Sequence, residues 1–363
     1  MEQCLGKDPP WLQSEHLAIK MSHASGYSFQ ILDGGAAWTY TGPHGQNHWS
    51  PSYPACAGKA QSPVNIETRR VVYNSSLPPI KTKGYREPED PTFLLLNEGH
   101  TVKMCLPPSM YLDGLPKRYT AQQLHLHWGS GDIQGGAEHR VNGMAFPAEL
   151  HVVHYNSEDY SSAKEARDQP DGLAVLGVLI EVAEEPNPAY DHILNYLKNI
   201  KYAGQEISIP SFDVQYLLPD QLDQYYRYRG SLTTPPCYES VLWTVFYQKV
   251  QISTAQLSKL QHTLYSSRAE KSPVTLENNF RRLQPLNNRT VYSTFPLGPP
   301  FTYSTGEIAA IVVGTVLALV GLVLGLYFLV KRSRTQKQQG QKVVVFKSSA
   351  SCSETADPVL QQP

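Results

Sequence analysis

Two short segments with alternating histidines constrain the fold of this 363-residue chain more than any other feature. Leu124–Gly129 reads L-H-L-H-W-G, and Glu149–His154 reads E-L-H-V-V-H. Both segments alternate and are rich in β-branched and aromatic residues, a pattern that predicts strands. Alternate side chains of a strand share a face, so we expect His125 and His127 to point the same way. His151 joins them if the two strands are neighbours in one sheet.

Three imidazoles that converge from two strands favour a catalytic zinc site. Zinc prefers four ligands, and three protein nitrogens leave the fourth position for water. Glu149 is expected on the same face as His151. The alternative is that these are ordinary histidines of a sheet, because a lone H-x-H motif often occurs without a metal. The choice between the two interpretations depends on the rest of the chain.

The composition favours a large domain of short strands. Hydrophobic residues make up 41% of the chain, and its 28 prolines and 25 glycines indicate many turns rather than a helical bundle. We therefore expect one mostly β (α+β) domain over residues 38–296. The formal net charge of −1 gives no support for a nucleic-acid partner.

A histidine follows a tight turn further upstream. Residues 94–102 read as a strand, a turn at Gly99 and the beginning of a second strand, with His100 directly after the turn. A lone histidine in such a place is most often a surface turn residue. The functional alternative is a proton shuttle, because histidine alone titrates near neutral pH without perturbation.

A series of longer motifs occurs in a fixed order over about residues 38–296. These motifs are Q-S-P-V-N-I, L-N-E-G-H, L-H-L-H-W-G, A-E-H, A-E-L-H-V-V-H, D-G-L-A-V-L-G and G-S-L-T-T-P-P. In this order they resemble the α-class carbonic anhydrases, and within that family its membrane-anchored members. The resemblance implies a single domain around a large twisted, mostly antiparallel sheet, with zinc at the base of a conical cleft.

The resemblance also implies a role for individual residues. His125, His127 and His151 match the ligands of the Zn²⁺ cofactor. Gln123 and Glu149 match the partners that orient two of these rings, which in metal sites fix the tautomer and the direction of the imidazole.

The reaction implied by the resemblance is the reversible hydration of carbon dioxide to bicarbonate and a proton. Thr233 and Glu138 match the pair that orients a zinc-bound hydroxide toward carbon dioxide, and Thr234 matches a substrate residue. Tyr40 and His100 match the water wire and the proton shuttle. The apolar substrate pocket would consist of Val153, Val175, Leu232, Val241 and Trp243. Without the resemblance, each of these five would be interpreted as a core residue.

A second functional class stays open, namely a catalytically silent carbonic-anhydrase-like binding module on a membrane stalk. Silent relatives typically lack one or more of the zinc histidines, whereas this chain keeps all three together with Thr233 and Glu138.

Two residues depart from the family pattern. Glu98 stands where asparagine is common, and Lys103 stands where a neutral amide is common. Both add charge near the shuttle path, with an unknown direction of effect on the shuttle pKa.

Cysteines and sequons point to an oxidising compartment. By the resemblance, Cys56 and Cys237 form a disulfide, and the alternative is two free buried thiols. Cys105 has no evident partner in the sequence. Asn74 and Asn288 begin N-glycosylation triplets, a short motif that also arises by chance.

The composition changes after the domain. Residues 297–307 form a linker rich in Pro, Gly, Ser and Thr, and residues 308–330 contain no charge, enough to span a bilayer. The basic run Lys331–Arg334 follows, so residues 331–363 are expected as a cytoplasmic tail of a single-pass type I protein of the plasma membrane. Gly321 and Gly325 form a G-x-x-x-G pair that would suit a homodimer.

Residues 1–37 are harder to interpret, and we expect a flexible, atypical leader. They lack the apolar core of a secretory signal, although the expected extracellular position of the domain needs export. Either another form of the protein begins with a true signal just before Trp38, or the domain of this form stays in the cytosol.

Overall fold

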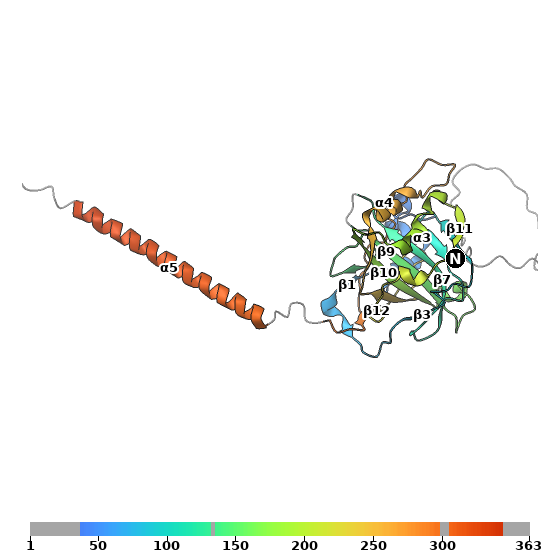
Figure 1. Cartoon of the computed structure of the whole chain (residues 1–363), viewed down its shortest axis with the longest axis horizontal. Coiled ribbons are helices and arrows are strands. Elements are labelled where there is room, and N and C mark those ends of the chain that lie inside the picture. Colours follow the sequence, from blue (N-terminus) through green and yellow to red (C-terminus); the bar gives the residue numbers. More distant parts are fainter. Residues whose placement is uncertain (1–36, 132–134, 298–304, 344–363) are drawn as a thin grey trace, which may run out of the picture. The chain divides into compact units, whose positions relative to one another are not determined.

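The computed structural model describes residues 37–131, 135–297 and 305–343. The chain divides into two compact units, residues 1–297 and 298–363, which are described separately below. Most of the expected leader, most of the linker and the end of the tail lie outside the described residues. The first unit is a domain built around one large sheet, as the sequence predicts (Figure 1).

The strands of this domain are short except for three in its centre. Their bounds are β1 (Asn65–Ile66), β2 (Val72–Tyr73), β3 (Lys81–Lys83), β4 (Thr92–Asn97), β5 (Val102–Cys105), β6 (Tyr111–Asp113), β7 (Tyr119–Trp128), β8 (Arg140–Val141), β9 (Ala148–Asn156), β10 (Leu173–Ala183), β11 (Glu206–Pro210), β12 (Tyr225–Gly230), β13 (Val241–Phe246), β14 (Val250–Ser253) and β15 (Tyr292–Ser293). The long strands β7, β9 and β10 run through the middle of the domain (Figure 1).

The described residues form a 13-stranded sheet in the order β11-β4-β5-β7-β9-β10-β13-β12-β15-β2. Off this path, β14 pairs with β10, while β6 pairs with β3 and β7. Most neighbours are antiparallel, and the parallel pairs of this sheet are β10–β13, β10–β14 and β15–β2. A separate two-stranded pair joins β1 and β8. The expected mostly antiparallel sheet is therefore confirmed.

Helices are few and mostly short. Their bounds are α1 (Trp49–Ser52), α2 (Ala163–Ala166), α3 (Pro188–Leu194), α4 (Thr254–Thr263) and, in the second unit, α5 (Thr305–Val343). Short 3-10 helices are η3 (Gly42–His44), η4 (Gln46–His48), η5 (Pro54–Ala57), η6 (Thr68–Arg70), η7 (Leu197–Asn199) and η8 (Val214–Leu217). Helix α4 begins with a capping box, in which Ser253 and Gln256 exchange side-chain and backbone hydrogen bonds.

The two faces of the sheet carry different environments because side chains alternate along each strand. On β7, Leu124 and Leu126 belong to the larger apolar core, which also includes residues of α3 and α4 such as Ile193 and Leu260. The alternate residues His125 and His127 face the other side. The histidines therefore lie on a strand whose opposite face packs against the larger apolar core.

One disulfide ties the start of the domain to the loop after β12. Cys56 lies in η5, and its Cα is 4.9 Å from that of Cys237. The predicted pairing of these two cysteines is confirmed, and Cys237 is fully buried. The sequence shows no partner for Cys105, but this cysteine is also disulfide-bonded.

The second unit contains helix α5. Residues Ile308–Arg334 are long and apolar enough to cross a membrane, by length and composition. The helix starts before the expected span 308–330 and continues beyond it to Val343. Lys, Arg and Gln are good helix formers, which accounts for the continuation. The space around Gly321 and Gly325 is open, with nothing within 4 Å of an added Cβ. Dimerisation through this pair stays a prediction.

Candidate active site

The three histidines singled out from the sequence converge on one point. Strands β7 and β9 are antiparallel neighbours, and their register places His125 opposite His151. The ring centroid of His127 lies 4.9 Å from that of His125 and 4.5 Å from that of His151. One nitrogen from each of the three rings lies within 4.8 Å of the other two. The spacing suits a single metal ion bound by three imidazoles.

Acceptors hold the outer nitrogens of the two β7 histidines. Nδ1 of His125 lies 2.9 Å from Oε1 of Gln123, and Nδ1 of His127 lies 2.7 Å from the carbonyl oxygen of Asn279. An N–H at each Nδ1 leaves a lone pair on Nε2. Nε2 of His127 is buried and has no hydrogen-bond partner among the described residues, as expected of a metal ligand.

Burial lowers the pKa of both β7 histidines. The pKa of His125 falls well below its ordinary value, because of burial first and then the neighbouring His127, His151 and Lys103. Burial also lowers the pKa of His127, against the opposing effect of Glu138. Metal ligation requires neutral imidazoles, so these environments fit a bound zinc ion.

The third histidine belongs to a buried hydrogen-bond chain. Nε2 of His151 lies 2.7 Å from Oε1 of Glu149, which also lies 2.7 Å from Nδ1 of His139. Nε2 of His139 lies 2.6 Å from the hydroxyl of Tyr228, which lies 2.8 Å from that of Ser62. With Nε2 committed to Glu149, Nδ1 of His151 is the nitrogen left for a metal.

Glu149 is the centre of this chain. Its Oε2 accepts backbone N–H groups from Glu138 at 2.8 Å and His139 at 2.7 Å. Burial would raise the pKa of Glu149, but His139 and His151 hold it well below its ordinary value. His139, Glu149 and His151 also have the spacing of a metal site. Both nitrogens of His139 are already in hydrogen bonds, however, so this second group is a structural network.

Glu138 lies beside the three histidines. Its Oε1 accepts the backbone N–H of Arg281 at 2.8 Å and is 3.5 Å from Nδ1 of His127. Its Oε2 is buried without a hydrogen-bond partner among the described residues. Thr233 is itself 5% exposed, and the proton relay between Thr233 and Glu138 stays a prediction. Thr234 is half-buried in the same loop, where its carbonyl oxygen accepts the N–H of Cys237 at 2.9 Å.

The five residues predicted to form an apolar pocket come together. Val153 pairs with Val175 across β9 and β10, and Val175 pairs with Trp243 across β10 and β13. Val241 belongs to the same buried cluster, and Leu232 packs against it. The ring centroid of Trp243 is 4.8 Å from that of His151. An apolar wall therefore stands directly beside the histidine centre.

Tyr40 and His100 lie in a group of aromatic rings. The imidazole of His100 stacks on Trp38 with ring centroids 3.9 Å apart, and Trp38 in turn is 5.4 Å from Tyr40. Burial lowers the pKa of His100 to about 4, while Glu98 acts in the opposite direction. Burial, Glu138 and Glu98 raise the pKa of Tyr40 well above its ordinary value.

The two departures from the family pattern contact each other. Lys103 Nζ forms an ion pair with Glu98 Oε1, and the lysine side chain is only 4% exposed. The sequence shows both charges but gives no sign of their pairing. The direction of the His100 pKa shift, which the sequence leaves open, is downward, and its main cause is burial.

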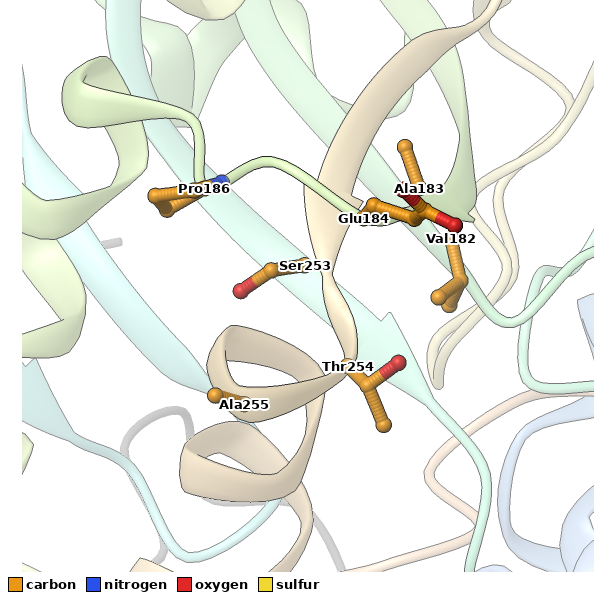
Figure 2. A pocket seen from close by; sticks show the side chains of 7 residues that line it. All are labelled: Val182, Ala183, Glu184, Pro186, Ser253, Thr254 and Ala255. Atoms are coloured by element: carbon orange, nitrogen blue, oxygen red, sulfur yellow. The ribbon is translucent and has the colours of Figure 1, made fainter.

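The pocket drawn in Figure 2 is not part of this centre. It has a volume of about 560 Å³ and is open to solvent between the end of β10 and the start of α4. Its lining residues are Val182, Ala183, Glu184, Pro186, Ser253, Thr254 and Ala255. None of the candidate catalytic residues lines it, so the chemistry is assigned to the histidine centre.

Sequence reasoning missed three contributors to the site. His139 lies in the quoted A-E-H motif, and its place directly after Glu138 is the signal that could have singled it out. Asn279 and Arg281 lie in an irregular segment far along the chain, where no periodic pattern marks them.

Comparison with known proteins agrees with this geometry. The model of the eukaryotic-type carbonic anhydrase family matches residues 44–295. Human carbonic anhydrase 12 is 44% identical over 314 residues, which cover 85% of this chain and 88% of that protein. Human carbonic anhydrase 6 is 43% identical over 285 residues, covering 76% of this chain and 90% of that protein. The chain therefore belongs to the eukaryotic-type carbonic anhydrase family and is an enzyme of that class.

Proposed function

We propose that the chain catalyses the reversible hydration of carbon dioxide to bicarbonate and a proton, with Zn²⁺ held by His125, His127 and His151. The observation that carries this proposal is the convergence of three imidazoles whose outer nitrogens are each held by an acceptor. When bound, zinc acidifies its water ligand, an effect for which carbonic anhydrase is itself the standard example, with a pKa of about 7 for that water.

Thr233 and Glu138 would orient the attacking oxygen. The free Oε2 of the buried Glu138 carboxylate is an acceptor that suits the Thr233 hydroxyl. If the Thr233 hydroxyl donates its one hydrogen bond to Glu138, its oxygen can only accept a hydrogen bond from the attacking oxygen. This arrangement directs a lone pair of that oxygen toward the apolar wall.

The apolar wall of Val153, Val175, Leu232, Val241 and Trp243 would hold carbon dioxide. Carbon dioxide has no net charge or dipole, so an apolar surface binds it without competing hydrogen bonds. Thr234, in the loop above this wall, would contact the substrate or product.

Tyr40 and His100 would carry the proton away. Each turnover releases one proton inside the cleft, and an imidazole can accept it and return it to buffer. The stack of His100 on Trp38 shows a defined position for this imidazole.

The decisive experiment is stopped-flow carbon dioxide hydration by the full chain in detergent, with zinc content determined on the same sample. We expect about one zinc per chain and a rate far above the uncatalysed reaction. A zinc-free chain, or a zinc-loaded chain without activity, would instead favour the silent binding module.

We further propose that the domain lies outside the cell on a single-pass type I anchor in the plasma membrane. Helix α5 supplies a candidate span, the basic run after Val330 favours a cytoplasmic C-terminal side, and the Cys56–Cys237 disulfide suits an oxidising compartment. The sequon residue Asn288 is exposed and Asn74 half-buried, so glycans at both are part of the proposal.

A protease that cannot cross membranes tests this topology. Applied to intact cells, it should digest the domain and leave α5, and a glycosidase should increase gel mobility. Complete protection of an unglycosylated domain would show that the domain faces the cytosol.

A further inference from the structure

The turn between β4 and β5 carries the charged pair of Glu98 and Lys103. The Lys103 side chain is 4% exposed and that of Glu98 22% exposed. A lysine this deeply buried is rarely tolerated without a partner, because its desolvation costs several kcal/mol. The ion pair with Lys103 therefore fixes the position of the Glu98 carboxylate.

The two charges act on different groups of the site. Lys103 is the register partner of His125 across β5 and β7, and its charge contributes to the lowered pKa of His125. Glu98 precedes His100 by two residues in the turn, and its charge raises the pKa of His100 against the larger effect of burial. Lys103 thus lies opposite a metal-site histidine, and Glu98 lies in the turn that carries His100.

The turn does not need the ion pair for its shape. Asn97 Oδ1 accepts the N–H of Gly99 at 2.8 Å, and Asn279 Nδ2 donates to the carbonyl oxygen of His100 at 3.0 Å. These bonds hold the backbone of the turn between two strands of the sheet. A purely structural role therefore does not explain why an ion pair is buried here.

We propose that Glu98, held in place by its ion pair with the buried Lys103, is a positioning residue for proton transfer, because it keeps a fixed negative charge in the turn that carries His100. The inference rests on the proposed shuttle role of His100. In the step concerned, an O–H bond of a water in the cleft breaks, an N–H bond forms on the imidazole, and a buffer base then removes that proton.

The other groups around His100 cannot replace this charge. Trp38, which stacks on the ring, is uncharged, and Tyr40 is neutral because its pKa lies well above its ordinary value. Lys103 carries the opposite sign. Glu98 is the charged group that acts on the pKa of His100 among the described residues.

The test compares two variants of the zinc-loaded full chain with the unmodified chain. Glu98→Gln removes the charge at constant shape, and the double variant Glu98→Lys with Lys103→Glu keeps an ion pair but reverses it. The readouts are kcat in weak buffer, kcat/KM, and the pKa of His100 from its imidazole NMR signals.

We expect both variants to lower the pKa of His100 and to reduce kcat in weak buffer by about three- to tenfold, roughly the effect of one nearby charge in a partly buried site. In Glu98→Gln, which leaves Lys103 in place, kcat/KM should change less than about twofold, and added imidazole should restore kcat. The exposed pair Lys117–Asp159 provides the control, since Lys117→Gln with Asp159→Asn should alter none of these quantities.

If kcat in weak buffer and the pKa of His100 are the same in the reversed variant as in the unmodified chain, the inference is overturned. Such a result would mean that the ion pair has a structural role that does not depend on which residue carries the negative charge. That variant also decides the matter if Glu98→Gln fails to fold. An inactive unmodified chain, or a His100→Ala variant with full activity in weak buffer, would instead count against the proposed function.

Discussion

His125 and His151 lie directly opposite each other across the β7–β9 ladder. The same ladder places His127 opposite Glu149, which holds His151. Because side chains alternate, a register shift of one residue in β7 would turn His125 and His127 to the far face of the sheet, and the same shift in β9 would turn His151 away. The register of two strands thus assembles the centre, and the large apolar core behind β7 and β9 holds that register.

Removal of one central imidazole should abolish activity. In His127→Ala we expect zinc content to fall to a small fraction of one per chain and hydration to fall by at least about a hundredfold, because two nitrogens bind zinc far more weakly than three. Zinc analysis and stopped-flow hydration check this. The exposed His262 provides a matched control, and His262→Ala should keep both zinc and rate. Full hydration by a zinc-free His127→Ala chain would contradict the assignment.

Loss of the shuttle should affect proton transfer alone. In His100→Ala we expect kcat in weak buffer to fall about tenfold while kcat/KM stays within about twofold, since hydration itself does not use this imidazole. Added imidazole should restore kcat by carrying the proton in solution. An unchanged kcat in weak buffer would rule out the shuttle role.

The sequence predicted the centre of the site better than its surroundings. His125 and His127 lie on one strongly alternating strand, so periodicity placed them on one face, whereas His151 joins them only because β7 and β9 are neighbours. Asn279, which holds His127, lies more than 150 residues further along the chain, outside any strand, and no local pattern leads to it. Long-range contacts of irregular segments depend on the packing of the whole domain rather than on local propensity.

The ion pair of Glu98 and Lys103 shows the same limit for charges. Both residues are visible in the sequence as departures from the family pattern, and their individual effects on His100 would oppose each other. Only the fold shows that Lys103 lies opposite His125 across β5 and β7 and that the two charges form an ion pair. The outer bounds of α5 differ for another reason, because helix-forming polar residues extend a span that hydrophobicity alone would end.

Acid should destabilise the domain through buried histidines outside the metal centre. His154 is fully buried, with Nε2 2.5 Å from the Tyr85 hydroxyl, and burial lowers its pKa to about 3. In the unfolded chain its pKa is about 6.5, so below that pH the unfolded state binds a proton that the folded state does not. The stabilisation is complete above about pH 6.5 and is lost as the pH falls toward 3.

This effect can be measured with a residue that does not titrate. Between pH 7 and 4.5 we expect the free energy of unfolding of His154→Gln to fall by about 2–3 kcal/mol less than that of the unmodified chain. Urea unfolding at both pH values, with a chelator present to exclude metal effects, provides the comparison. The exposed His262→Gln should behave like the unmodified chain, and an equal loss in all three proteins would contradict the prediction.

The disulfide should stabilise both the domain and the loop that carries Thr233. Cys56 and Cys237 are 181 residues apart, so their bond removes much of the conformational freedom of the unfolded chain. The loop is also held by Gln61 Nε2, which donates to the Cys237 carbonyl oxygen at 3.1 Å. We expect Cys56→Ser with Cys237→Ser to lower the free energy of unfolding by about 2–5 kcal/mol.

Activity measurements separate the two effects of the bond. If the disulfide positions Thr233 as well as stabilising the domain, the double serine variant should show a lower kcat/KM at a temperature where circular dichroism proves it fully folded. Zinc content should stay near one per chain, because the three ligands lie on β7 and β9 rather than on this loop. A fully folded variant with unchanged kcat/KM would limit the disulfide to global stability, and hydrogen bonds such as that of Gln61 would then suffice to hold the loop.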